Sequence, residues 1–168
     1  MTGSPRVMHT VVQALLMALW LGGAVLFSAV VARAAFAVLP SRTLAGALVG
    51  KVLPVVFYSG IVLSLAAALL ESKYRGGGVT GRAPMVALGV VTGACLVAQL
   101  FVGSRIASLR AQMQGPIESL AATDPLRVAF GRLHMYSVAW LGVAIVAALV
   151  SVVLSARAIA AAQTLPRS

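Results

Sequence analysis

The chain has 168 residues, of which 61% are apolar and only 10% are charged. Soluble domains use roughly 45–50% apolar and about 25% charged residues, and a water-soluble fold of this size could not bury so large an apolar excess. The composition therefore excludes an ordinary soluble domain and predicts an integral membrane protein. No Pro-, Ser- or acid-rich linker divides the chain, so residues 1–168 are expected to form a single transmembrane domain.

The formal net charge of +10 comes from thirteen Lys and Arg residues set against three Asp and Glu residues. The basic residues are scattered singly, and none falls inside the four long apolar runs, which is typical of side chains that flank membrane spans. A nucleic-acid interface would need these residues clustered on one face. We therefore expect anionic lipid headgroups, and no nucleic acid, as the partners of this charge.

The N-terminal apolar run superficially resembles a secretory signal, because it follows Arg6. However, residues 11–31 form a run of 21, longer than the about 7–15 residues of a signal's apolar core, so we interpret it as a helix. The single cysteine, Cys95, lies inside another apolar run. The chain can therefore form no internal disulfide and no thiolate metal cluster.

Charged residues mark the edges of four apolar runs. A hydrocarbon core about 30 Å thick needs about 20 helical residues, and a basic side chain at its centre costs roughly 2.5–3.5 kcal/mol. Four transmembrane helices are therefore expected over residues 11–31, 52–70, 84–102 and 136–156. Four crossings put both termini on the same side of the membrane. Six Lys and Arg residues lie on that side and seven on the other, so the positive-inside rule favours neither orientation.

The first two connections have different sequence patterns. After Pro40, Ser41 is followed by apolar residues at helical spacing, which predicts a short interfacial helix capped by Ser41. The Gly-rich stretch over residues 71–82 predicts a flexible hairpin loop.

The third connection predicts a helical hairpin between the third and fourth helices. Apolar residues continue at helical spacing beyond the third span until Gly115 and Pro116, and Asp124 followed by Pro125 is typical of a helix start. The two helices are therefore expected to pack on each other and to protrude from the membrane by about 10 residues, or about 15 Å.

Small residues recur at helical spacing in every span. In lipid, helices associate through close backbone approach at such residues. The expected ridges are Ala14, Ala18 and Gly22; Gly60, Ser64 and Ala67; Gly89 and Gly93; and Ala144, Ala148, Ser151 and Ser155. Together with the spans they predict an all-α, four-helix membrane bundle.

Polar residues inside the spans are few and are the default candidates for function. On the first helix, His9, Gln13 and Trp20 share a face. The third helix has a similar face, made by Thr92, Cys95 and Gln99. One interpretation is interhelical hydrogen bonding, with His9 as an interfacial anchor. The other is a small polar pocket that binds a cofactor or substrate.

His134 and Ser137 lie near the start of the fourth span, where His134 is either a hydrogen-bonded interfacial histidine or a ligand. His9 begins the first span, so the two histidines are expected near opposite membrane faces, about 30 Å apart. They cannot share a haem or metal ion. The candidate cofactor-binding residues are His9, Gln13, Trp20, His134 and Ser137.

Other catalytic chemistry finds little support in the sequence. The carboxylates are Glu71, Glu118 and Asp124, all outside the spans, so no relay of buried acids is available. No phosphate-binding loop, nucleophile elbow or zinc motif is present. We therefore assign no catalytic residues and no metal site.

Three stretches of the chain carry a family resemblance. They are His9 with Leu19-Trp20-Leu21-Gly22-Gly23 and Leu26-Phe27; Phe36 to Leu53-Pro54 with Phe57-Tyr58; and Asp124-Pro125 with Phe130, Leu133-His134 and Ser137. In this order, over about 130 residues, they resemble the transmembrane protein 205 family, also called domain of unknown function 4149. The resemblance implies a four-helix membrane protein without established catalytic residues, whose animal members are linked to trafficking and platinum-drug tolerance. Where eukaryotic members tend to have a second Ser and an Asn after the His, this chain has Val138 and Leu141.

The first stretch is also similar to copper-resistance membrane proteins and to haem-dependent, membrane-bound protoporphyrinogen oxidases. In those proteins the His precedes the Trp by about two helical turns, whereas His9 and Trp20 are three turns apart. This similarity implies at most a shared helical architecture, which does not fix function.

The sequence favours a non-enzymatic protein that acts as a small transporter-like or accessory subunit. Its Ala-, Arg- and Val-rich usage is typical of a bacterial inner membrane, and residues 103–135 would provide the contact surface for protein partners. The alternative is a haem- or metal-binding redox protein that uses His9 or His134. A channel is disfavoured, because the spans lack the polar stripe of a water-filled pore.

Overall fold

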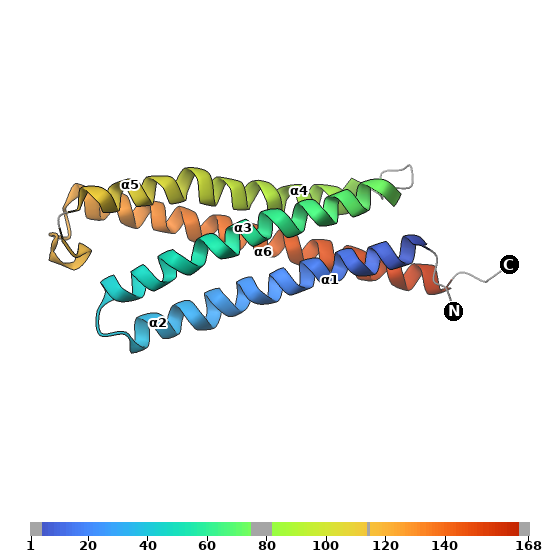
Figure 1. The fold of residues 1–168 in the computed structure, drawn as a ribbon, viewed down its shortest axis with the longest axis horizontal. Helices are drawn as coiled ribbons and strands as arrows, with labels where there is room; N and C mark the ends of the chain where they lie inside the picture. The colour runs from blue at the N-terminus through green and yellow to red at the C-terminus, as the bar shows by residue number, and fades with distance from the viewer. Residues whose placement is uncertain (1–4, 75–81, 114, 165–168) are drawn as a thin grey trace.

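The computed structural model describes residues 5–74, 82–113 and 115–164, and these residues form a bundle of long helices with no strand among them (Figure 1). Four helical segments have the length and apolar character of membrane spans. They are Arg6–Val38, Arg42–Lys73, Arg82–Gln112 and Pro125–Thr164. The all-α fold and the four spans expected from the sequence are confirmed, and the chain is a multi-pass membrane protein.

The first span consists of α1 (Pro5–Leu26), a π-helical segment η1 (Phe27–Val31) and α2 (Ala32–Val38). The backbone stays helical throughout and ends where Leu39 becomes extended, with ψ of 142°. The extended conformation of Leu39 is the one favoured before a proline. The span is therefore longer than expected, because α2 continues beyond the charged edge at Arg33.

The second span is one continuous helix, α3 (Arg42–Tyr74). The Ser41 hydroxyl caps it as expected, since its Oγ accepts a hydrogen bond of 3.2 Å from the Leu44 amide. The separate short interfacial helix expected after Ser41 is wrong. The helix continues past Lys51 and through Pro54, and Lys51 is exposed, so its long side chain reaches the headgroups without interrupting the helix.

The third span is made of α4 (Arg82–Leu96), a π-helical segment η3 (Val97–Gly103) and α5 (Ser104–Gln112). The helix expected beyond the third apolar run is confirmed as α5. The Gly-rich loop expected over residues 71–82 lies mostly outside the described residues, with α3 and α4 at its two ends.

The fourth span is α6 (Pro125–Thr164), which follows a short 3-10 helix, η4 (Ile117–Ser119). Its expected start is confirmed, since Asp124 Oδ1 accepts a hydrogen bond of 2.8 Å from the Leu126 amide and Pro125 is the first helical residue. The helix has 40 residues and is about 60 Å long, about twice the thickness of the hydrocarbon core. It therefore extends well beyond the hydrocarbon.

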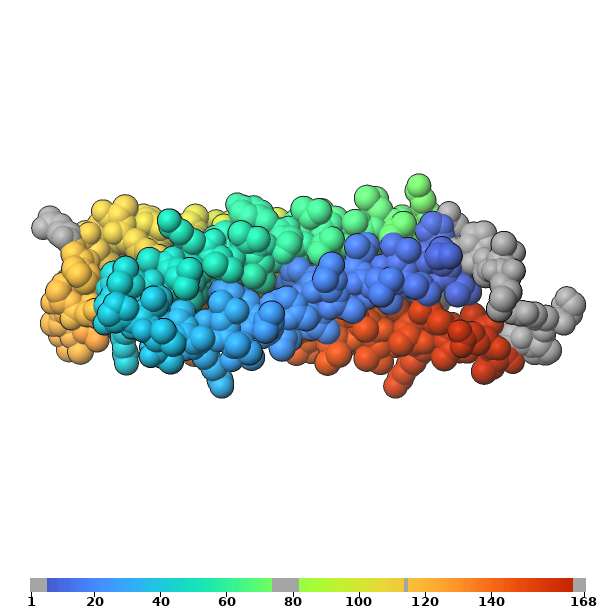
Figure 2. Space-filling view, turned by 60° about the horizontal axis from the view of Figure 1, so that its bottom comes forward, coloured from blue at the N-terminus to red at the C-terminus, as the bar shows by residue number. Residues whose placement is uncertain are grey.

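The four spans lie lengthwise against one another. In Figure 2, α1 (blue) lies between α3 (green) and the end of α6 (red), and α1 contacts both helices. The start of α1 and the end of α6 lie at the same end of the bundle (Figure 1). Side chains from all four spans form the main core. They include Trp20, Phe57, Cys95 and Leu141.

Two of the four expected small-residue ridges face a neighbouring helix. Gly60, Ser64 and Ala67 are buried, as is the ridge that contains Ala144 and Ala148. The ridges on the first and third helices are wrong: a Cβ atom added at Gly22 or Gly89 would meet no atom within 4 Å. The buried face of α1 carries larger residues, among them Met17 and Trp20. Ala18, Gly22 and Gly89 are exposed.

Candidate functional site

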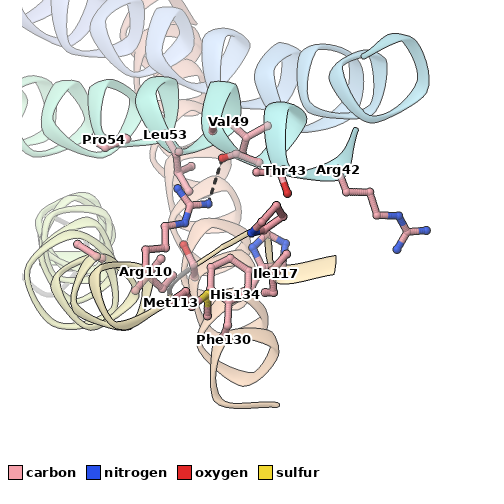
Figure 3. Close-up of a pocket in the computed structure, with 18 of the residues that line it drawn as sticks. Arg42, Thr43, Val49, Leu53, Pro54, Arg110, Met113, Ile117, Phe130 and His134 are labelled. Carbon is pink, nitrogen blue, oxygen red and sulfur yellow. Dashed lines mark hydrogen bonds between the residues drawn. The ribbon is translucent and has the colours of Figure 1, made fainter. Parts of the chain in front are cut away.

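A cavity of about 740 Å³ opens between α3, the η3–α5 segment and the start of α6 (Figure 3). It lies at the end of the bundle opposite the start of α1. Its apolar wall includes Val49, Leu53, Pro54, Phe57, Ala98, Ile106 and Phe130. Its polar lining comprises Arg42, Thr43, Gln99, Arg110, His134 and Ser137. Small-molecule sites have volumes of roughly 300–1,000 Å³ and combine an apolar lining with a few polar groups, so this cavity has the size and character of a ligand site.

Two glycines on α3 make room for an arginine of α5. The Arg110 Nη2 donates a hydrogen bond of 3.1 Å to the Gly46 backbone oxygen (Figure 3). One turn further along α3, a Cβ atom at Gly50 would lie only 2.8 Å from Arg110 Nη1. A side chain at position 50 would therefore displace the guanidinium group. The Gly-x-x-x-Gly spacing of these residues was the sequence signal for this site, and it was not among the expected ridges.

Arg110 also contacts α6. Its guanidinium carbon lies 5.3 Å from the centroid of the Phe130 ring, within the range of a cation–π interaction. The side chain is exposed, and a guanidinium group carries five N–H donors, of which the Gly46 oxygen uses one. Arg110 therefore links three helices while it keeps donors available at the cavity.

His134 and Ser137 both line the cavity, so the structure brings these two predicted residues together. The exposed His134 ring stacks on Phe130, with ring centroids 6.4 Å apart and an angle of 4° between the planes. Ser137, one turn further along α6, is 3% exposed. Arg42 differs from them, because its side chain points away from Arg110 and His134 (Figure 3).

Gln99 reaches the cavity from the π-helical segment η3. Together with Ala98 and Gly103 it supplies the η3 part of the wall, next to the residues of α5. π-Helical turns insert an extra residue into an α-helix and occur often at functional sites. Here the π-helical segment faces the cavity together with α5.

The predicted candidates on α1 lie elsewhere. His9 is half-buried near the start of α1, at the end of the bundle opposite His134. The side chain of Gln13 is 1% exposed, and within the described chain its Nε2 has no hydrogen-bond partner. Trp20 Nε1 donates a hydrogen bond of 2.9 Å to the Val56 oxygen of α3. None of these three residues lines the cavity.

The three residues of the polar face expected on the third helix have different environments: two pack against α3 and one lines the cavity. Thr92 Oγ1 lies 2.7 Å from Ser64 Oγ, in an interhelical hydrogen bond. Cys95 is buried as a free thiol beside Gly60. Both residues therefore hold α4 against α3, and Gln99 is the member of this face that reaches the cavity.

A second hollow of about 380 Å³ lies between α1 and α3. We call it the α1–α3 groove; its lining includes Leu19, Val31, Val52 and Val55. Several of these side chains are exposed on the outer surface of the bundle. In a bilayer they face lipid chains. The polar residues of the groove are Trp20 and Ser59, and among the described residues it has no charged lining residue such as the Arg110 of the cavity.

No group of three or more His, Cys, Asp or Glu side chains is arranged to hold a metal ion among residues 5–74, 82–113 and 115–164. His9 lies in the first turns of α1 and His134 in the first third of α6, and the starts of these two helices lie at opposite ends of the bundle (Figure 1). The cavity therefore offers one histidine, His134, for any cofactor.

Comparison with known proteins identifies a family. Residues 15–115 match the model of the family described as domain of unknown function (DUF4149). The match includes most of the first three spans and most of the cavity wall on α3, η3 and α5. Neither a curated protein nor a solved structure matches the chain. Because the family model covers more than half of its residues, the chain belongs to the DUF4149 family of membrane-spanning helical proteins.

Proposed function

We propose that this protein is a non-enzymatic, transporter-like or accessory membrane protein that takes a small amphipathic molecule into the cavity between α3, α5 and α6. One observation carries this proposal: the cavity combines an apolar wall with basic and polar residues at its rim. A ligand with an apolar part and a polar part would match both regions.

The position of the cavity along the spans supports an amphipathic ligand. Lys51, Arg105 and Arg132 are exposed and mark the edge of the apolar runs at this end. Phe57 lies six residues inward from Lys51, or about 9 Å along the helix. Arg110 lies five residues outward from Arg105, about 7 Å in the other direction. The cavity therefore crosses the boundary between headgroups and hydrocarbon.

The accessory role would use the hairpin over residues 103–135. No residue of α5 is buried, so the surface of this helix is available to a protein partner. The resemblance to the transmembrane protein 205 family supports a transport-related role, because its animal members are linked to trafficking. We further propose a bacterial inner membrane as the location, with both termini on one side and anionic lipids around the basic residues.

The proposal is tested by filling the cavity. Ala47 and Ala107 line it and are exposed, whereas Ala139 on α6 is exposed but does not line it. The protein would be purified in mild detergent, and the bound small molecules and lipids identified by native mass spectrometry. Ala47→Phe and Ala107→Phe should lose a ligand that the parent and Ala139→Phe retain. Equal retention by all four proteins, or no bound molecule in any of them, would contradict the proposal.

The same preparation tests the alternative, a redox protein that binds haem or metal through His9 or His134. A Soret band or bound copper would be measured in the parent and in the His9→Ala and His134→Ala variants. Loss of either signal in one variant would favour the redox role over the amphiphile-binding role.

A further inference from the structure

We infer that the ligand of the cavity is an anionic lipid from the surrounding bilayer, with its headgroup bound by Arg110 and His134 and its acyl chain against the wall of α3. This inference rests on the proposed function and names the ligand class and the residues that select it. The observation behind it is the charge of Arg110, whose contacts in the part of the chain that the structure describes are a backbone oxygen and an aromatic ring.

Among residues 5–74, 82–113 and 115–164, Arg110 makes two contacts, and both are with uncharged groups. One is the Gly46 backbone oxygen and the other is the Phe130 ring. Neither removes the positive charge of the guanidinium group. Arginine is well suited to phosphate and carboxylate groups, because its planar N–H donors can form two parallel hydrogen bonds with them. An anionic headgroup would therefore neutralise the charge of Arg110 and accept hydrogen bonds from its remaining N–H donors.

The carboxylates of the 113–124 connection are engaged elsewhere. Glu118 Oε1 accepts a hydrogen bond of 3.0 Å from the Thr43 amide at the start of α3. A negative charge there is stabilised by the helix dipole. Asp124 Oδ1 accepts a hydrogen bond from the Leu126 amide. The anion that pairs with Arg110 is therefore expected from outside the chain.

His134 provides a second polar group close to Arg110. Both residues contact the Phe130 ring, and both line the cavity. A neutral imidazole ring carries one N–H donor, which can add a hydrogen bond to a headgroup oxygen. The two side chains therefore place an arginine and a histidine on one side of the same opening.

The apolar wall of the cavity is suited to contact the acyl chain of a lipid. From the level of Arg110 the cavity extends along Val49 and Leu53 to Phe57, toward the hydrocarbon. A free inorganic anion would leave this wall uncovered, whereas an acyl chain would fill the space along it and gain van der Waals contacts with Val49, Leu53 and Phe57. A bilayer lipid also reaches the site without leaving the membrane.

The test compares two arginines of α5. Arg105 is exposed like Arg110, but it does not line the cavity. The parent, Arg110→Gln and Arg105→Gln would be placed in nanodiscs of phosphatidylcholine with a minor fraction of phosphatidylglycerol, and the retained lipids measured by native mass spectrometry. The parent and Arg105→Gln should retain phosphatidylglycerol preferentially. Arg110→Gln should lose this preference by roughly tenfold, since a hydrogen bond to a charged group contributes about that factor or more.

The outcomes separate this inference from the proposed function. If Arg110→Gln keeps the preference while Ala107→Phe loses all bound lipid, the headgroup inference is wrong and the cavity proposal stands. If the parent retains no lipid of either kind, the proposed function itself fails. Displacement of the bound lipid by inorganic phosphate alone would show that the tail is not recognised and would overturn the assignment to a bilayer lipid.

A second variant keeps the test decisive if Arg110→Gln does not fold. The exposed His134 ring can be removed by His134→Ala with little effect on packing. Loss of one hydrogen bond to the headgroup predicts a decrease in the phosphatidylglycerol preference of at least roughly threefold. An unchanged preference in this variant would remove His134 from the headgroup site and contradict the inference.

Discussion

Trp20 of α1 and Val56 of α3 are joined by a hydrogen bond of 2.9 Å from the indole Nε1 to the backbone oxygen. The same oxygen accepts a hydrogen bond of 3.0 Å from Ser59 Oγ. One turn along α3 from Val56, a Cβ atom at Gly60 would lie 2.8 Å from both Trp20 Nε1 and Cys95 Sγ. The first three spans therefore meet at Gly60, where the backbone of α3 packs directly against two side chains.

The tight contact at Gly60 predicts that Gly60→Ala destabilises the bundle. The added methyl group must push α1 and α4 away, and overpacking of this kind costs roughly 1–3 kcal/mol. The free energy of unfolding would be measured by titration with denaturing detergent. The control is Gly22→Ala, where the methyl group meets no atom within 4 Å and should leave stability unchanged or raise it by up to about 1 kcal/mol. Equal effects of both substitutions would rule out close packing at Gly60.

The buried amide of Gln13 predicts a stabilising substitution. Gln13 is 1% exposed, and among the described residues its Nε2 has no partner. Leaving a buried donor unsatisfied costs about 1–3 kcal/mol, so Gln13→Leu should raise the free energy of unfolding by about 1 kcal/mol. Gln163→Leu, at an exposed position of α6, is the matched control. A clear loss of stability in Gln13→Leu would indicate that a bound water or ligand satisfies the amide.

The burial of Cys95 predicts that its thiol is inaccessible in the folded protein. The side chain is 0% exposed and packs against the position of Gly60. A water-soluble maleimide should therefore leave Cys95 unmodified until the protein is denatured. Ser108→Cys places a second thiol on the exposed surface of α5 and should react at once. Labelling would be followed by mass spectrometry, and rapid modification of Cys95 in the native protein would contradict the observed packing.

The cap of α6 predicts a local effect of Asp124→Ala. Without Oδ1 the Leu126 amide loses its acceptor, which costs about 0.5–2 kcal/mol at a helix N-terminus. Hydrogen exchange should become faster at the amides of the first turn of α6 and stay unchanged in the core of the bundle. Asp124→Asn retains an acceptor oxygen and should behave almost like the parent. Uniform acceleration across all spans would show that the cap stabilises the whole fold.

Local chemistry made several parts of the fold predictable. The four spans follow from the exclusion of basic side chains from hydrocarbon, which depends only on the position of residues such as Lys51 and Arg105. The cap at Asp124 depends on one side chain and the backbone that follows it. These features need no knowledge of neighbouring helices. The cap lies where the sequence predicted it, and each predicted span lies within a longer helical segment.

Other features depend on how the spans meet, and the sequence alone did not reveal them. Gly22 and Gly60 have similar patterns around them, but only Gly60 faces a neighbouring helix. The cavity joins Gly46 to Arg110, which are 64 positions apart, through a hydrogen bond that no local pattern indicates. The interfacial helix after Ser41 was mispredicted because the rule for span length ended the second span at Lys51, although the backbone continues without interruption.

The shared position of the first and last helical turns has a practical consequence for engineering. The start of α1 and the end of α6 lie at the end of the bundle away from the cavity (Figure 1). A fluorescent protein fused at either place would leave the opening around Arg110 unobstructed. Two copies joined by a flexible linker from α6 to α1 would insert in parallel, as a covalent tandem in which both cavities face the same side of the membrane.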